Sequence, residues 1–210
     1  MAVSFPTSPS NGQTYTYNDI TFTWDGVKWV AQFNAAQATL TVDALPLSGG
    51  TMTGSIAVNA NNSYDLGSQT KQFASVYGHT IEATYADLAE RYEIDIQSEV
   101  GTVVVFGGDK EITPCQHEAD ISVAGVISTE PAFKMNSLAG NDNTHPFVAL
   151  RGRVPCKVIG PVRKGDLMIT SSTLGVAKSA GRNDMGHAVF AKSLVEDLSN
   201  DIKIIEVVII

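Results

Sequence analysis

The sequence has few charged residues and no cluster of basic ones. Lys, Arg, Asp and Glu make up 17% of the 210 residues, against about 25% in an ordinary soluble domain. The net charge is −8, and no run of Lys or Arg interrupts it. A nucleic-acid-binding face needs such a run to offset phosphate charge, so we expect no nucleic acid among the partners.

The composition also argues against a disulfide framework and against membrane segments. Only two cysteines are present, Cys115 and Cys156, too few for such a framework. We expect two free buried thiols, with a single bridge as the alternative. The longest apolar runs, such as 103–106 and 207–210, are far too short to span a bilayer. Because residues 1–10 lack the basic and apolar regions of a signal peptide, we expect a protein made in a cytoplasm, without membrane insertion.

Signatures of catalysis and of metal binding are missing as well. Cys115-Gln-His117 has no second Cys or His pair at ligand spacing, and the four histidines are scattered. Asn141-Asp-Asn143 lacks the bidentate Glu of a calcium loop. No nucleotide-binding or Gly-x-Ser-x-Gly fingerprint occurs. We therefore expect no enzyme, no cofactor and no metal, with one His per chain on a threefold axis as the alternative for a metal.

Residues 1–33 have the pattern of a small β-meander. The segments 14–17, 20–24 and 28–32 alternate with period two and are separated by Asn-Asp and Asp-Gly turns. About thirty residues seldom fold alone, so this module is expected to dock on a neighbour or on another copy. An aromatic strip that binds sugar is the alternative to a packed core. The expected core residues are Tyr15, Phe22, Trp24 and Trp29.

Residues 34–83 contain too few large apolar residues to bury a core within one chain. Residues 47–56 read LSGGTMTGSI, and Phe73, Val76 and Tyr77 have the spacing of one face of a short helix or 3₁₀ turn. A strand is expected at 80–83. Three chains around an axis can bury the apolar side chains together, which favours a homotrimeric stalk, with a flexible linker as the alternative. The expected stalk contacts are Leu47, Met52, Ile56, Val58, Leu66 and Phe73.

Residues 84–210 form a segment long enough to fold around its own hydrophobic core. Apolar segments separated by Gly, Pro, Asn and Asp, without helical periodicity, predict an antiparallel β-sandwich or barrel. Asp87, Glu90 and Arg91 are expected in a capped, salt-bridged short helix at the start. The apolar C-terminal run is expected to be a buried strand. The predicted strands lie in 100–112 (two strands and a turn), 121–128, 147–158, 167–170, 175–178, 187–194 and 203–210.

Two parts of the sequence resemble bacteriophage tail-fibre proteins. The LSGGTMTG string looks like a fibre repeat unit, and D-L-G-S-x-x-x-x-F-x-x-V-Y at 65–77 resembles the element that follows such repeats. The N-terminal pattern resembles a module of phage and cyanophage tail-fibre-like proteins. Its matching residues are Phe5, Pro6, Ser8, Pro9, Gly12, Tyr15, Trp24, Asp25, Gly26 and Trp29.

The C-terminal part resembles the intramolecular chaperone family of phage fibres, whose self-cleaving members are the G2 peptidases. The matching segments are 85–93, 125–128, 149–154 and 164–166. The resemblance implies a domain that sets the register of three chains, and in some members is cut off near an A-D-x-A-E segment. Here the candidates for that chemistry are Thr84, Asp87 and Glu90. Because Thr84-Tyr85-Ala86-Asp87 replaces the Ser-Ala-Asp of cleaving members, we expect an uncut chain.

Together these features predict a mainly β virion structural protein with units at 1–33, 34–83 and 84–210. We expect a short homotrimeric phage tail fibre or fibre-like appendage, assembled in the host cytoplasm, that acts in assembly and host adhesion. The expected partners are two further copies and other virion proteins of the baseplate, tail or neck, with a host surface glycan or receptor as a further candidate. The alternatives are a self-cleaving chaperone and a capsid decoration protein.

Overall fold

The protein is built from strands. The computed structural model describes residues 4–18, 20–32, 50–181, 186 and 188–210. These residues contain no helix, and 36% of the structure is strand, so the predicted mainly β class is confirmed. The chain divides into two compact units, Met1–Ser75 and Val76–Ile210, and each is described by itself.

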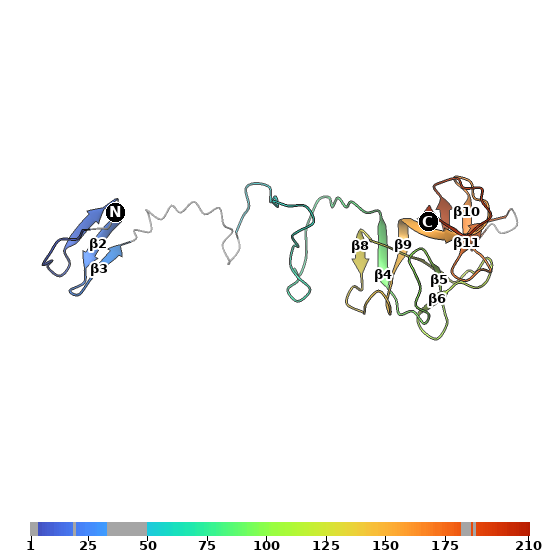
Figure 1. The fold of residues 1–210 in the computed structure, drawn as a ribbon, viewed down its shortest axis with the longest axis horizontal. Helices are drawn as coiled ribbons and strands as arrows, with labels where there is room; N and C mark the ends of the chain where they lie inside the picture. The colour runs from blue at the N-terminus through green and yellow to red at the C-terminus, as the bar shows by residue number, and fades with distance from the viewer. Residues whose placement is uncertain (1–3, 19, 33–49, 182–185, 187) are drawn as a thin grey trace. The chain divides into compact units, whose positions relative to one another are not determined.

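The first unit begins with a three-stranded antiparallel meander. Its strands are β1 (Thr14–Tyr17), β2 (Ile20–Trp24) and β3 (Trp29–Gln32), in the order β1-β2-β3 (Figure 1). Asp25 shapes the β2–β3 turn, because its carboxylate accepts hydrogen bonds from the backbone N–H groups of Val27 and Lys28 at 2.9 and 2.8 Å. Gly26 follows with φ +99°, a conformation that favours glycine. The meander expected from the sequence is present.

Residues 50–83 form neither helix nor named strand. The short helix expected around Phe73, Val76 and Tyr77 is absent, and so is the strand expected at 80–83. A single helical turn is not stable without a surface to pack against, and the described chain offers none here. The backbone hydrogen bonds within this segment join Ser68 and Lys71 alone among the described residues. The helical spacing was therefore a wrong guide to local structure.

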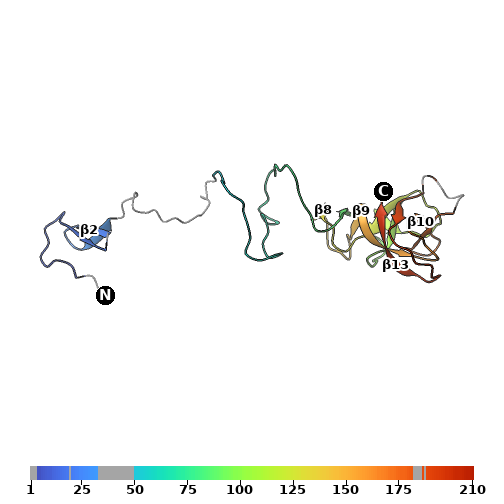
Figure 2. The same cartoon turned by 90° about the horizontal axis from the view of Figure 1, so that it is seen from above.

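Five strands of the second unit close into a small barrel. Their order is β9 (Phe147–Val158), β13 (Lys203–Ile209), β12 (Ala191–Ser193), β10 (Leu167–Thr170) and β11 (Ala177–Ser179). A parallel pairing of Ala177 with Val158 returns β11 to β9 and completes the circle. Figure 2 shows β9 and β13 side by side, as their seven-residue register requires. Of the two predicted alternatives, the barrel is the one present.

Five more strands extend the sheet from the N-terminal half of β9. β7 (Val123–Ile127), β5 (Val103–Phe106) and β6 (Ile112–Pro114) follow one another on one side. β4 (Asp87–Arg91) also pairs with β9, and β8 (Phe133–Met135) pairs with β4. The prediction of a short helix at Asp87–Arg91 is therefore wrong, because this segment is the strand β4. The segment is held extended by strands on both of its edges.

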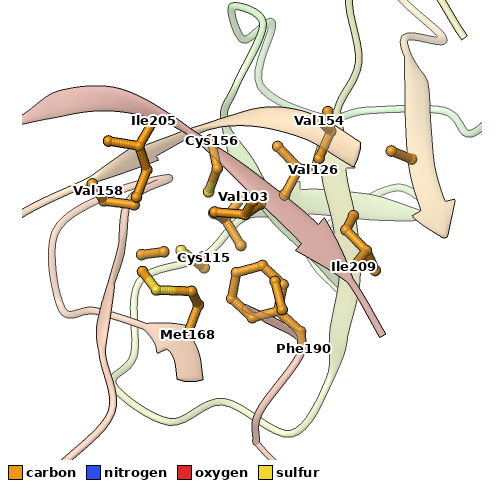
Figure 3. Close-up of a cluster of buried hydrophobic side chains, with 14 of the residues drawn as sticks. Val103, Cys115, Val126, Val154, Cys156, Val158, Met168, Phe190, Ile205 and Ile209 are labelled. Atoms are coloured by element: carbon orange, nitrogen blue, oxygen red, sulfur yellow. The ribbon is translucent and has the colours of Figure 1, made fainter. Parts of the chain in front are cut away.

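The main hydrophobic core is formed by side chains of the five barrel strands together with side chains of β5 and β7, and Figure 3 shows it in close-up. Cys115 and Cys156 both lie in it as free, fully buried thiols. Burial raises the pKa of Cys115 to about 11 and also raises that of Cys156. The largest fully buried side chains are Ile112, Met168, Ile169, Val103, Val104, Val126, Val148, Val154, Val158, Val162, Val207 and Thr170.

The C-terminal strand β13 is buried on one face only. Ile205, Val207 and Ile209 point into the core, whereas Ile204 and Ile210 are exposed. The expectation that the whole apolar run is buried is therefore correct for alternate residues. This is the period-two pattern of a strand with one face on the core.

Candidate functional site

The stalk segment, defined here as residues 50–86, is exposed along its whole length. Every one of these 37 consecutive residues is in contact with solvent, and the Tyr77 side chain is 96% exposed. Five of the six predicted stalk residues belong to it, and Leu47 lies outside the described residues. Its exposed large apolar side chains are Met52, Ile56, Val58, Tyr64, Leu66, Phe73, Val76, Tyr77, Ile81 and Tyr85.

One turn within the stalk segment is held by backbone hydrogen bonds. The backbone groups of Ser68 and Lys71 exchange hydrogen bonds of 3.0 and 3.2 Å. Gly67 has φ +86°, and a Cβ built on it would lie 3.0 Å from the Lys71 carbonyl oxygen and 3.5 Å from the Phe73 ring. The D-L-G-S-x-x-x-x-F pattern thus encodes a tight turn that lays an aromatic ring against a glycine. The ring itself stays exposed.

The N-terminal meander carries an aromatic cluster on one face. The four predicted core residues lie in it, since Tyr15 pairs with Phe22 and Trp24 with Trp29 across the strands. Phe5 completes the cluster: its ring stacks on Trp29 at 5.4 Å and meets Phe22 edge-on at 5.0 Å. Phe5 was not among the predicted core residues, although it stands in the Phe-Pro pattern. None of the described residues from 4 to 31 is fully buried, so the cluster is only half covered.

A cavity of about 350 Å³ lies in the second unit where β4 begins. Thr84, Asp87 and Ser128 are among its lining residues. Asp87 is 5% exposed and Ser128 is 8% exposed. The Ser128 hydroxyl donates a hydrogen bond to Asp87 Oδ2 at 2.6 Å. The cavity therefore holds a buried hydroxyl–carboxylate pair beside a second hydroxyl residue.

Two further pairs stand at the same cavity. The Tyr85 hydroxyl hydrogen-bonds Glu130, and this bond raises the pKa of Tyr85. Arg153 lies 3.6 Å from the Glu206 carboxylate. The packing beside this cavity requires glycine at position 152. A Cβ on Gly152 would lie 2.1 Å from the Ala86 carbonyl oxygen. Only glycine lets the chain that enters β4 approach β9 so closely.

Glu90, the third candidate for self-cleavage, does not line this cavity. It accepts a hydrogen bond of 2.9 Å from the Tyr92 hydroxyl. Burial, followed by this bond, raises the pKa of Tyr92 to about 12. The structure thus brings Thr84 and Asp87 together and places Glu90 elsewhere. Ser128 joins them instead, 41 residues from Asp87 in sequence.

Arg91 also has partners other than those expected in a short helix. Its guanidinium pairs with Asp142 at 2.8 Å, donates to the His145 carbonyl oxygen, and lies 3.9 Å from the centre of the Phe147 ring. These contacts fix β4 to the loop before β9. The internal salt bridge expected within 87–91 is replaced by contacts over about fifty residues of sequence.

The described part of the chain has no group of three or more His, Cys, Asp or Glu side chains that could hold a metal ion. Nor does that part contain a helix long and apolar enough to cross a membrane. A scan against protein-family models finds no match for the chain, and a search of curated proteins finds none either.

Proposed function

We propose that this protein is a structural protein of a phage virion: a short homotrimeric fibre or fibre-like appendage that acts in assembly and host adhesion. One observation carries the proposal, the unbroken exposure of the stalk segment. Ten large apolar side chains lie exposed within 37 residues of a single chain. A segment of this kind needs other chains to cover it.

The energetics point the same way. Ordering one residue of backbone costs about 1–2 kcal/mol. Within the described stalk segment, the backbone hydrogen bonds that could offset this cost in one chain are those between Ser68 and Lys71. Burying one large apolar side chain contributes about 1.5–3 kcal/mol. Three parallel copies around an axis would bury the side chains of all three together, as the resemblance to fibre repeats implies.

The other two parts fit subsidiary roles in this proposal. The barrel unit has its own closed core, so it can fold first and hold three chains in register. The meander keeps a half-covered aromatic cluster, which suits attachment to another virion protein or to a host surface. Both roles come from the resemblance and are proposals with it.

Light scattering after size-exclusion chromatography tests the trimer. We expect a mass three times that of the 22.3 kDa chain. The double variant Leu66→Asp/Phe73→Asp should dissociate it, because six buried charges around the axis would repel one another. Gln69→Asp, at an exposed polar position in the same turn, should leave the trimer intact. A chain that stays monomeric at every concentration would overturn the proposal.

The cavity favours a second candidate function, self-cleavage. In that reaction the Ser128 hydroxyl would add to a nearby backbone carbonyl carbon and pass its proton to Asp87. Asp87 would return the proton to the departing amide nitrogen, and water would then hydrolyse the ester. Intact mass decides between the two functions. One species of 22.3 kDa supports the uncut fibre protein, whereas a fragment beginning near residue 84, absent in Ser128→Ala, supports cleavage.

A further inference from the structure

Strand β8 leaves one edge of the sheet in the second unit open. Among the described strands it pairs with β4 alone. All three of its residues are exposed, and the apolar ones, Phe133 and Met135, are 45% and 36% exposed. An edge strand presents unpaired backbone N–H and C=O groups, which form a template for a further strand. The free edge of β8 can therefore accept another extended segment.

Residues 80–83 have the sequence of a strand but no partner. They read Thr-Ile-Glu-Ala, contain neither turn nor bend, and are exposed throughout. Their backbone groups form no hydrogen bond with any other described residue. Within one chain they do not pair with β8. A second copy of the chain supplies both the missing strand for β8 and the missing edge for residues 80–83.

The free charges of the two segments are complementary. In the part of the chain that the structure describes, neither Lys134 of β8 nor Glu82 forms an ion pair. The Lys134 ammonium lies 5.5 Å from the centre of the Phe147 ring, which also carries the guanidinium of Arg91. Arg91 is neutralised by Asp142, so the unbalanced positive charge on this face is that of Lys134.

The two segments also match in pattern. β8 reads Phe-Lys-Met, and residues 81–83 read Ile-Glu-Ala, so each places one charged residue between two apolar ones. When Glu82 lies opposite Lys134, apolar residues lie opposite apolar residues whichever way the added strand runs. Because side chains alternate along a strand, the charged pair then occupies one face and the apolar pairs the other. Opposite charges in such a cross-strand pair stabilise it, and like charges destabilise it.

We propose that residues 80–83 of one copy add to the free edge of β8 in the next copy, with Glu82 opposite Lys134. The contact joins two different surfaces, and three such contacts close a ring when the rotation between copies is threefold. The inference rests on the proposed trimer and names the contact that fixes the register of its chains.

Charge reversal tests the pairing, measured by light scattering over a dilution series. Glu82→Lys alone and Lys134→Glu alone place like charges opposite each other. Each should raise by about tenfold or more the chain concentration at which half of the protein is trimeric. The double variant Glu82→Lys/Lys134→Glu should restore the parent value. Lys192→Glu, at an exposed position on β12, is the matched control: it should not weaken the trimer, nor should it rescue Glu82→Lys.

The unmodified protein provides a second measurement. A water-soluble carbodiimide joins a carboxylate directly to an amine that it touches. Denaturing electrophoresis should show covalent dimers and trimers, with Glu82 joined to Lys134 in the peptides found by mass spectrometry. Glu82→Gln should abolish this linkage.

The outcomes separate the inference from the trimer. A trimeric parent in which both reversals are silent, or in which Lys192→Glu rescues as well as Lys134→Glu, overturns the pairing and leaves the trimer standing. A trimeric parent without the Glu82–Lys134 linkage does the same. A parent that is monomeric at every concentration overturns the proposed trimer and this inference with it.

Discussion

The ammonium group of Lys203 lies 3.1 Å from a carboxylate oxygen of Asp197, at the turn that leads into β13. The same nitrogen donates to the carbonyl oxygens of Gly160, Asp197 and Ser199 at 2.9, 3.0 and 2.7 Å. The Lys203 side chain is only 11% exposed. One charged group thus ties the turn before β13 to the segment that leaves β9.

Replacing this lysine should destabilise the barrel. Lys203→Met keeps the aliphatic stem but takes the donor away from the carbonyl oxygens of Gly160 and Ser199. It also removes the ammonium group from Asp197, whose carboxylate keeps its hydrogen bonds from Ser199. We expect a loss of about 2–4 kcal/mol in the free energy of unfolding. Urea unfolding followed by circular dichroism measures it. Lys192→Met, at an exposed position on β12, should change the free energy little, and equal effects of the two variants would contradict this assignment.

Asp197 predicts a dependence of stability on acid. Hydrogen bonds from the backbone and hydroxyl of Ser199, and then from Lys203, lower its pKa from 3.8 to about 2. A lowered pKa in the folded state means that the ionised form favours folding. Its contribution is complete above about pH 4 and disappears as the pH falls to about 2. Between these pH values, stability should fall less steeply in Asp197→Asn than in the parent, with Asp201→Asn as the control. An unchanged slope in Asp197→Asn would refute the prediction.

Gly152 should tolerate no side chain. Both Gly152 and Gly160 have positive φ, of +102° and +79°, but only at Gly152 would an added Cβ meet a backbone oxygen, at 2.1 Å. Gly160→Ala should cost about 1 kcal/mol from the backbone alone. Gly152→Ala should cost more than about 3 kcal/mol, because the chain entering β4 must move. Thermal unfolding measures both effects, because Gly160→Ala reports on backbone strain alone and Gly152→Ala on strain together with the clash. Similar melting temperatures of the two variants would argue against the clash.

Phe5 should hold the N-terminal meander together. Its ring contacts Tyr15, Phe22 and Trp29, and removing it opens the cluster. Phe5→Ala should destabilise this module by about 2–4 kcal/mol. The chain has two tryptophans, Trp24 and Trp29, both in this module. Tryptophan fluorescence during urea unfolding therefore reports on it alone, and Val27→Ala, on the exposed turn, is the control.

The two thiols should be inert in the folded protein. Both are fully buried, and burial raises the pKa of Cys115 to about 11. Since the thiolate is the reactive form, a thiol reagent such as dithionitrobenzoate should label neither cysteine at about pH 8. Unfolding in guanidinium chloride should release two reactive thiols per chain. Labelling of the native protein, or one disulfide per unfolded chain, would contradict the structure.

The strands that could be predicted from the sequence are those in which apolar and polar residues alternate. Buried apolar residues alternate with less buried ones at Val154, Cys156 and Val158 and again at Ile205, Val207 and Ile209, and both segments are strands. β4 could not be predicted in this way, because Asp-Leu-Ala-Glu-Arg consists largely of good helix formers. Its strand conformation comes from pairing with β9, about sixty residues later in the chain. Sequence-distant partners override local propensity here.

The same limit applies to the candidate site. Asp87 and Thr84 were found because they lie close together in one motif. Ser128 follows a strand and stands 41 residues from Asp87, and no local pattern indicates which carboxylate it meets. Phe5 is a similar case, since its partners lie on three strands that follow it. Close sequence neighbours reveal a motif, whereas the topology decides which groups actually meet.

The pairing of β4 has a consequence for synthesis on the ribosome. β4 follows the stalk segment directly, but its partners β8 and β9 are made later, and β13, which completes the barrel beside β9, is made after both. The stalk segment must therefore leave the ribosome before anything can anchor its end. β4 can therefore reach its final pairing only after β9 has been synthesised, and the barrel can close only after β13 has followed.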